Sequence, residues 1–140
     1  MRILRILPLL ALLAACSDTS GPGARDVRIS TTVNRSAPQG EPNATVNVEN
    51  RGSRPLLIAA CGDRIALTVD RNRNGRWENF SAGICLFDVA TVPVELDPGE
   101  SVSAPLWLRD PGRYRVQVNA FHPGDRDELR MVVSEPFEIR

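Results

Sequence analysis

The chain has 140 residues, 17 of them basic and 17 acidic, so its formal net charge is zero. Every basic residue is an arginine, which excludes Schiff-base and general-base chemistry on lysine. The absence of a basic excess argues against a nucleic-acid partner.

Residues 1–15 have the organisation of an export signal. Arg2 and Arg5 form a positive start, and residues 6–15 are apolar apart from Pro8. An apolar run of about ten residues is too short to span a bilayer as a helix, which takes about twenty. We therefore expect a helical signal peptide that is cleaved, and not a transmembrane anchor.

The run ends in Leu13, Ala14, Ala15 and Cys16, which resembles the lipobox of bacterial lipoproteins. This resemblance implies cleavage before Cys16, a diacylglycerol on its sulfur and often a further acyl chain such as palmitate on its amine. Two or more chains hold a protein stably on a membrane, whereas one does so only marginally. The alternative is an ordinary secretory signal, with Cys16 as a free or paired thiol.

A polar run over residues 17–23 follows and has the composition of a flexible tether. We predict a signal peptide at 1–15, a lipidated tether at 16–25 and one domain at 26–140, slightly acidic once Arg2 and Arg5 are removed. Ser17 stands where an aspartate would favour retention in the inner membrane of enteric bacteria. The expected location is therefore the cell envelope, and Ser17 favours the outer membrane over the inner membrane.

The rest of the chain has the signature of an all-β fold. Short apolar or alternating segments recur between turns rich in Gly, Pro, Asn and Asp, and none shows sustained helical periodicity. The pattern predicts strands at 27–33, 44–48, 56–61, 65–69, 76–80, 84–94, 102–108 and 113–121, and the segments 129–133 and 137–139 form the last strand or pair. We predict an immunoglobulin-like sandwich of two sheets with about seven to nine antiparallel strands.

Two of these segments carry further predictions. The continuous apolar run at 56–61 suits a central strand covered on both faces. Pro136 implies an interruption or an edge position in the last strand.

Cys61 and Cys85 remain as an even pair once Cys16 is lipidated. In an oxidising compartment we expect a disulfide between them. Metal binding and thiol redox chemistry are the rival interpretations, but the chain has neither a CxxC motif nor a Cys/His cluster.

Three segments resemble bacterial intracellular-proteinase-inhibitor-like domains, which are immunoglobulin-like sandwiches. They are 48–56 (VENRGSRPL), 96–101 (LDPGES) followed by Trp107, and 111–116 (PGRYRV). The resemblance implies the sandwich fold and, as an alternative function, inhibition of a proteinase in the envelope. No inhibitory loop can be assigned from it residue by residue.

The segment 70–75 (DRNRNG) begins like a calcium loop, with Asp70, Asn72 and Asn74 at alternate positions and Glu78 as a further oxygen ligand. Only Asp70 is charged among the first three, and arginines crowd the loop. The alternative is a type I′ hairpin in which Asn74 and Gly75 supply the positive φ angles.

Catalytic residues are not evident. His122 is the only histidine, and no Gly-x-Ser-x-Gly elbow accompanies it. We predict a solvated loop histidine beside the acidic segment 125–128, no enzymatic activity and no cofactor. Trp77 or Trp107 is expected to pack in the core near the disulfide, and an exposed tryptophan would instead contact a partner or a glycan.

The sequence therefore predicts a non-enzymatic, lipid-anchored module of the bacterial envelope. Its partners would be the membrane, through the lipid, and another envelope protein or a polymer. The alternatives are an envelope proteinase inhibitor and a weak calcium-binding module.

Overall fold

The computed structural model describes residues 22–23, 25–81, 92–125 and 129–140. The expected signal peptide and lipidation site, Cys85 and most of the predicted strand 84–94 lie outside this part. The described residues are all-β, with the following strands: β1 (Val27–Val33), β2 (Ala44–Asn50), β3 (Leu56–Ile58), β4 (Ala60–Cys61), β5 (Arg64–Ile65), β6 (Leu67–Arg73), β7 (Arg76–Ser81), β8 (Val94–Leu96), β9 (Ser101–Leu106), β10 (Gly112–Phe121), β11 (Arg130–Val133) and β12 (Phe137–Ile139).

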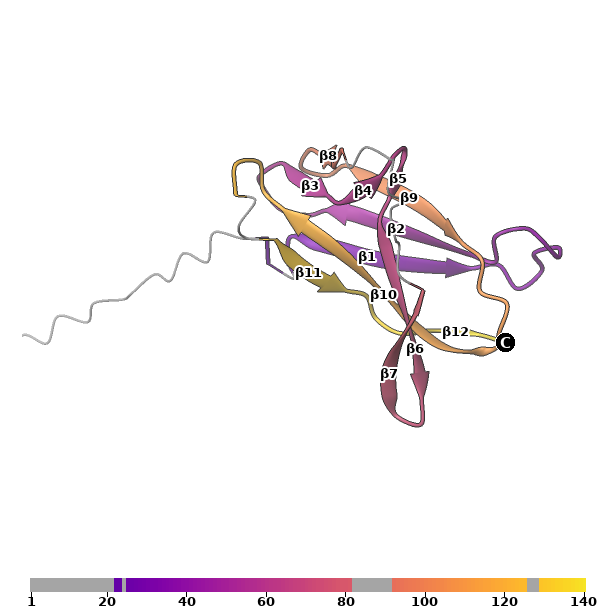
Figure 1. The fold of residues 1–140 in the computed structure, drawn as a ribbon. Helices are drawn as coiled ribbons and strands as arrows, with labels where there is room; N and C mark the ends of the chain where they lie inside the picture. Colours follow the sequence, from indigo (N-terminus) through magenta and orange to yellow (C-terminus); the bar gives the residue numbers. More distant parts are fainter. Residues whose placement is uncertain (1–21, 24, 82–91, 126–128) are drawn as a thin grey trace, which may run out of the picture.

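The strands form a two-sheet, immunoglobulin-like sandwich (Figure 1). One sheet has the order β1-β2-β9, and the other has the order β7-β6-β10-β3-β8 with β11 and β12 also paired to β10. β4 and β5 pair only with each other. All the pairings between these strands are antiparallel. Antiparallel strands can be joined by short turns, whereas a parallel pair needs a crossover connection of about a dozen residues or more.

The larger sheet is built from interrupted strands. Val118 of β10 pairs with β6 on one side and β11 on the other, and Ala120 pairs in the same way with β3 and β11. β3 and β6 therefore follow one another along one side of β10, and β12 and β11 along its other side. β8 lies beside β3 and β7 beside β6, so the sheet has four strand positions.

The core lies between the two sheets and follows the predicted alternation. Inward-facing residues of β2 and β10 are fully buried, among them Val46, Val48, Val116 and Val118. Apolar side chains of β3, β6 and β9 complete the same cluster. Burial of this stripe is the main favourable term for a domain of this size.

The predicted strand 56–61 is wrong in its second half. β3 ends at Ile58, and the chain then leaves the sheet as the β4–β5 hairpin, which turns at Gly62 with a φ of 62°. Ala66 donates to the carbonyl of Ala59 at 2.8 Å and closes the base of the hairpin, after which β6 resumes the strand. The sequence does not indicate that the chain leaves the sheet after Ile58, because the residues on both sides of this point are apolar.

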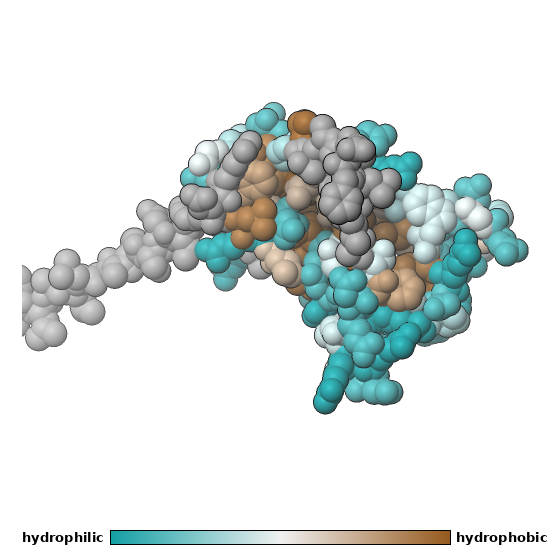
Figure 2. Space-filling model, in the orientation of Figure 1, coloured by the Kyte–Doolittle hydropathy of each residue, from teal (hydrophilic) through white to brown (hydrophobic). Residues whose placement is uncertain are grey.

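The Asn74–Gly75 hairpin is confirmed. Asn74 has a φ of 52° and Gly75 a φ of 82°, and Arg73 pairs with Arg76 across them. These two positive φ angles define a type I′ turn. The β6–β7 hairpin projects from the body of the sandwich (Figure 1), and its surface is hydrophilic (Figure 2).

Tyr114 is the largest fully buried side chain, and it closes one end of the core. Its hydroxyl donates to the carbonyl of Asp110 at 2.7 Å. Its ring contacts Phe80 edge-on at 5.4 Å and stacks with Phe137 at 6.1 Å. This is the tyrosine corner of immunoglobulin-like sandwiches, in which the hydroxyl bonds to the backbone a few residues upstream.

Burial raises the pKa of Tyr114 above its ordinary value, and the positive charge of Arg71 opposes this only in part. Below pH 10 the hydroxyl is protonated in both the folded and the unfolded chain. Above about pH 10 the unfolded chain ionises first, so we expect the folded state to lose stability as pH rises further.

Tyr114→Phe tests this corner. Loss of the hydrogen bond to Asp110 is expected to cost about 1–2 kcal/mol of unfolding free energy at neutral pH. Urea unfolding from pH 8 to pH 11 should show a smaller alkaline loss for the variant than for the wild type. Tyr114 is the only tyrosine and the chain has no lysine, so the difference between the two curves isolates one hydroxyl. Parallel curves would contradict the assignment.

Candidate functional site

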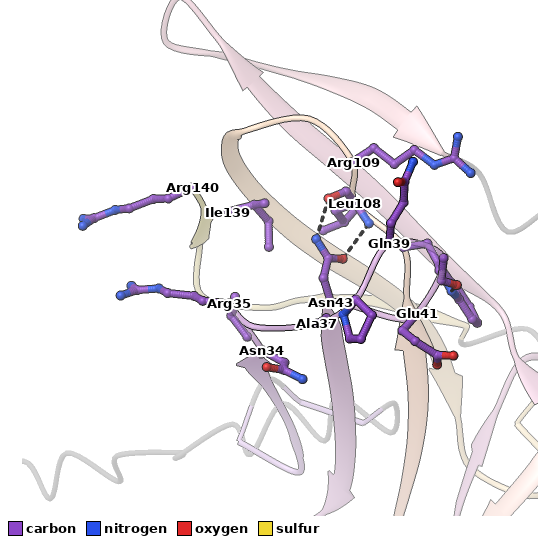
Figure 3. A pocket seen from close by; sticks show the side chains of 14 residues that line it. Asn34, Arg35, Ala37, Gln39, Glu41, Asn43, Leu108, Arg109, Ile139 and Arg140 are labelled. Carbon is purple, nitrogen blue, oxygen red and sulfur yellow. Dashed lines mark hydrogen bonds between the residues drawn. The ribbon is translucent and has the colours of Figure 1, made fainter.

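A cleft of about 390 Å³ opens at the end of the sandwich that carries the β1–β2 loop. Its walls are the loop 34–43, the start of the β9–β10 connection and the last residues of the chain (Figure 3). The lining residues are Val33, Asn34, Arg35, Ala37, Pro38, Gln39, Gly40, Glu41, Asn43, Trp107, Leu108, Arg109, Ile139 and Arg140.

Asn43 joins the two loops that form the cleft. Its side-chain amide donates to the Leu108 carbonyl at 2.6 Å, and its side-chain oxygen accepts from the Leu108 amide at 2.8 Å. Figure 3 shows both bonds spanning the gap between the loops. A paired bond of this kind fixes distance and orientation together, so the walls of the cleft are held at a set separation.

The loop 34–43 is itself folded. The Asn34 amide donates to the Asn43 carbonyl at 2.9 Å and closes its base. Further along, Glu41 donates to the Pro38 carbonyl at 3.1 Å across a turn in which Gly40 has a φ of 94°. That φ suits glycine because a side chain there would be strained.

Trp107 lies against this turn and is exposed. Its indole Nε1 donates to the Gly40 carbonyl at 3.2 Å, and 47% of the residue remains accessible to solvent. Trp107 is among the residues that line the cleft, and because its Nε1 is bonded, the part of the ring that remains exposed is apolar.

Neither tryptophan occupies the core, so the prediction of a buried tryptophan is wrong. Trp77 is half-buried on the outer face of the larger sheet, with the Arg115 guanidinium 4.6 Å above its ring. Tyr114 supplies the large buried aromatic ring instead. The sequence does not show which aromatic residue is buried, because Trp77, Trp107 and Tyr114 each lie in a segment that is predicted to be a strand.

The cleft is rich in arginine. Arg35, Arg109 and Arg140 line it together with one acid, Glu41. Arg140 is paired with Glu138 at 3.2 Å, whereas Arg35 and Arg109 form no ion pair with any acid among the residues that the structure describes. In Figure 3 Arg35 and Arg140 extend in one direction, and Arg109 lies on the other side of Asn43.

The residues of the predicted calcium loop do not converge in the hairpin. The Asp70 carboxylate accepts from Arg115 at 2.8 Å and from Gln117 at 2.5 Å on the outer face of the sheet. Asn72 accepts from the Gly75 amide at 3.1 Å. Glu78 pairs in register with Arg71, so it lies on the opposite face from Asp70 and Asn72.

Calcium binding through this loop stays an untested prediction to which the geometry adds no support. Asn74 is committed to the turn, and Glu78 lies 3.8 Å from Arg73. Within the described ranges, no three His, Cys, Asp or Glu residues are grouped so that they could hold a metal ion.

His122 is buried, which corrects the prediction of a solvated loop residue. Only 5% of it is exposed, and its Nδ1 lies 2.8 Å from the Pro55 carbonyl. A carbonyl only accepts, so Nδ1 carries the proton and the imidazole serves to tie the end of β10 to the start of β3. Asp125, from the predicted acidic segment, pairs with Arg54 at 3.2 Å.

Cys61 is half-buried in β4, and Cys85 lies outside the described residues, so their pairing remains a prediction. In the part of the chain that the structure covers, no helix is long and apolar enough to cross a membrane.

Sequence reasoning missed the cleft. Residues 36–42 were predicted only as a break between strands, and Asn43 and Leu108 are 65 positions apart. The sequence shows Trp107 at the end of a predicted strand and Asn43 next to a Pro/Gly-rich loop. Neither feature indicates that the two segments meet in the folded chain.

Asn43→Ala tests whether this side chain holds the cleft together. The Leu108 amide and carbonyl both lose their partner, so we expect a loss of about 1–3 kcal/mol in unfolding free energy. Faster hydrogen exchange at the Leu108 amide and a change in Trp107 fluorescence should accompany it. The matched control is Asn47→Ala in β2, the strand that follows Asn43, because the Asn47 side chain accepts only an exposed bond from Ser103. Equal effects from the two variants would contradict the special role of Asn43.

No protein-family model and no curated protein matches the chain. Among solved structures, the chain is similar to one described as Northeast Structural Genomics Consortium target SoR45, with 14% sequence identity and a TM-score of 0.43. That alignment covers 81% of this chain and 84% of the other.

Proposed function

We propose that this protein is a lipid-anchored, non-enzymatic binding module of the bacterial cell envelope, attached through Cys16 and binding a partner through the cleft beside Asn43. The lipobox at residues 13–16 supports the anchor. One observation supports the binding role most strongly. The cleft lies at a distance from the point where the chain enters the sandwich.

The entry point and the cleft lie at opposite ends of β1. The chain enters at Asp26, whose carbonyl accepts from the Arg51 amide at 2.7 Å and whose side chain accepts from Gly23 at 2.8 Å. β1 then runs for seven residues, about 20 Å, and ends at Val33 on the wall of the cleft. A module tethered before Asp26 would present the cleft on its far side from the membrane.

A structural disulfide between Cys61 and Cys85 belongs to this proposal. The strand formed by β3 and β6 is interrupted by the hairpin that carries Cys61. β8 begins beside Ile58 on one side of this interruption, and β7 ends beside Val69 on the other. The chain between β7 and β8 contains Cys85, and the two described ends of this segment pair with strands on either side of the hairpin that carries Cys61.

The chemistry of the described residues favours binding over catalysis. The sole histidine is buried and donates to a backbone carbonyl, and Asp70 is consumed by Arg115 and Gln117. Apart from the carboxylate of Glu41, the cleft is lined by arginine, amide, aromatic and apolar side chains, which bind ligands but supply no general base. Proteinase inhibition is the alternative function, and it rests on the sequence resemblance alone, because no described loop favours it specifically.

Cys16→Ser tests the anchor. The wild-type protein should sediment with membranes and have an intact mass that lacks residues 1–15 and carries acyl chains. The variant should lose both the acyl mass and the membrane association, because the thiol that receives the diacylglycerol is absent. A wild-type protein of unmodified mass would overturn the anchor, whichever fraction contains it.

The disulfide has its own test. Thiol labelling of unfolded protein should detect neither Cys61 nor Cys85 until reduction, and reduction should cost about 3.5 kcal/mol of unfolding free energy. Replacement of both cysteines by serine should abolish the effect of the reductant. Full labelling before reduction would contradict the bridge and reopen thiol or metal chemistry.

A further inference from the structure

We propose that the cleft beside Asn43 binds an acidic glycan, with a sugar ring on the exposed face of Trp107 and its acidic groups on Arg35 and Arg109. This inference rests on the proposed function and specifies the ligand class of the same site.

Trp107 supplies the stacking surface. Its only polar atom, Nε1, is already bonded to the Gly40 carbonyl, so what remains for a ligand is the apolar ring face. The C–H face of a sugar ring is apolar while its rim carries hydroxyl groups, and it therefore matches an aromatic plane surrounded by polar groups. The same bond orients the ring before binding, which lowers the entropic cost of association.

The surrounding side chains complement the rim of a sugar. Asn34 and Gln39 line the cleft and carry carboxamides, which can both donate and accept, although the Asn34 oxygen already accepts from the Ser36 amide at 3.1 Å. This is the donor and acceptor mixture that hydroxyl groups require. The cleft volume of about 390 Å³ falls within the usual range for small-ligand sites.

The charge of the cleft selects an acidic ligand. Three of its lining residues are arginines and one is an acid, although the mature chain is slightly acidic as a whole. Arg35 and Arg109 form no ion pair within the described part of the chain, so binding an anion there breaks no such bond. Guanidinium groups form strong, charge-assisted hydrogen bonds with carboxylate and phosphate groups.

The shape and position of the site favour a polymer. The cleft is open to solvent at one end of the sandwich, beside a largely hydrophilic surface (Figure 2). Arg35 and Arg109 lie on opposite sides of Asn43 in Figure 3 and extend away from each other, so a ligand that contacts both has to extend across the cleft, as a polymer does.

Single-tryptophan fluorescence gives a direct measure of binding. The chain has two tryptophans, so Trp77→Phe leaves Trp107 as the only one. The lipidated protein in detergent micelles is titrated with oligogalacturonate, in which every sugar carries a carboxylate. The expected result is a saturable change in Trp107 fluorescence. The affinity should fall as the salt concentration rises, because salt screens the attraction between the arginines and the carboxylates.

Three control ligands separate the contributions. Fully methyl-esterified oligogalacturonate keeps the sugars and removes the charges, whereas polyglutamate keeps carboxylates without sugars. Both should bind at least tenfold more weakly than oligogalacturonate. A sugar-phosphate polymer of the same length shows which acidic group is preferred. Failure of both acidic glycans to bind, or equal binding of polyglutamate, would overturn the proposal.

Variants assign the binding to named residues. Arg35→Gln and Arg109→Gln should each weaken binding about tenfold, which is typical for loss of one charge-assisted hydrogen bond. Arg64→Gln, exposed in the β4–β5 hairpin, is the matched control and should have no effect. Glu41→Gln should tighten binding, because it removes a like charge from the cleft. An unchanged or weaker affinity in Glu41→Gln would contradict the charge argument.

Trp107→Ala should also weaken binding about tenfold or more, and Trp107→Phe should restore part of the affinity. Binding to these variants is measured by calorimetry, because the fluorescent reporter is removed. Equal affinity of Trp107→Ala and the wild type would overturn the stacking role. This experiment fails independently of the anchor, since the mass and membrane assays report lipidation whether or not a glycan binds.

Discussion

The sandwich depends on two asparagine side chains, one at each end of β2. Asn50 is fully buried, and its amide group donates to the carbonyls of Arg54 and Leu96 while its oxygen accepts from Gly52. Because Leu96 belongs to β8, this side chain links the two sheets. Asn43 binds both backbone groups of Leu108 at the other end. Buried backbone groups without partners are costly, so these amides stabilise the points where strands leave the sheets.

This arrangement places the proposed point of attachment and the proposed binding surface at different ends of the sandwich. Asn50 and the Asp26–Arg51 bond hold the end at which the chain enters, and Asn43 holds the end at which the cleft opens. The sheets between them are packed without a described helix or long internal loop, so the two ends are joined through a continuous core. If the protein is anchored as proposed, this organisation places one rigid surface away from the anchor.

The sequence allowed the fold class and most strands to be predicted because their alternation reflects burial on one face. β1 and β12 have the predicted bounds, and the interruption before β12 occurs at Pro136 as expected. The prediction failed where long-range contacts decide the structure. His122 is buried through Pro55, 67 positions away, and the apolar segment 56–61 hides the departure of the β4–β5 hairpin. The cleft went unpredicted for the same reason, since its walls meet only in the folded chain.

Amide chemical-shift mapping of the mature protein with oligogalacturonate shows directly whether the end of the sandwich that carries Asn43 is the binding surface. Shifts that saturate together and concentrate in residues 34–43 and 107–109 and in the Trp107 indole N–H are the predicted result. Shifts centred elsewhere, on the β6–β7 hairpin or on the end near Asp26, would contradict the account even if the ligand bound tightly.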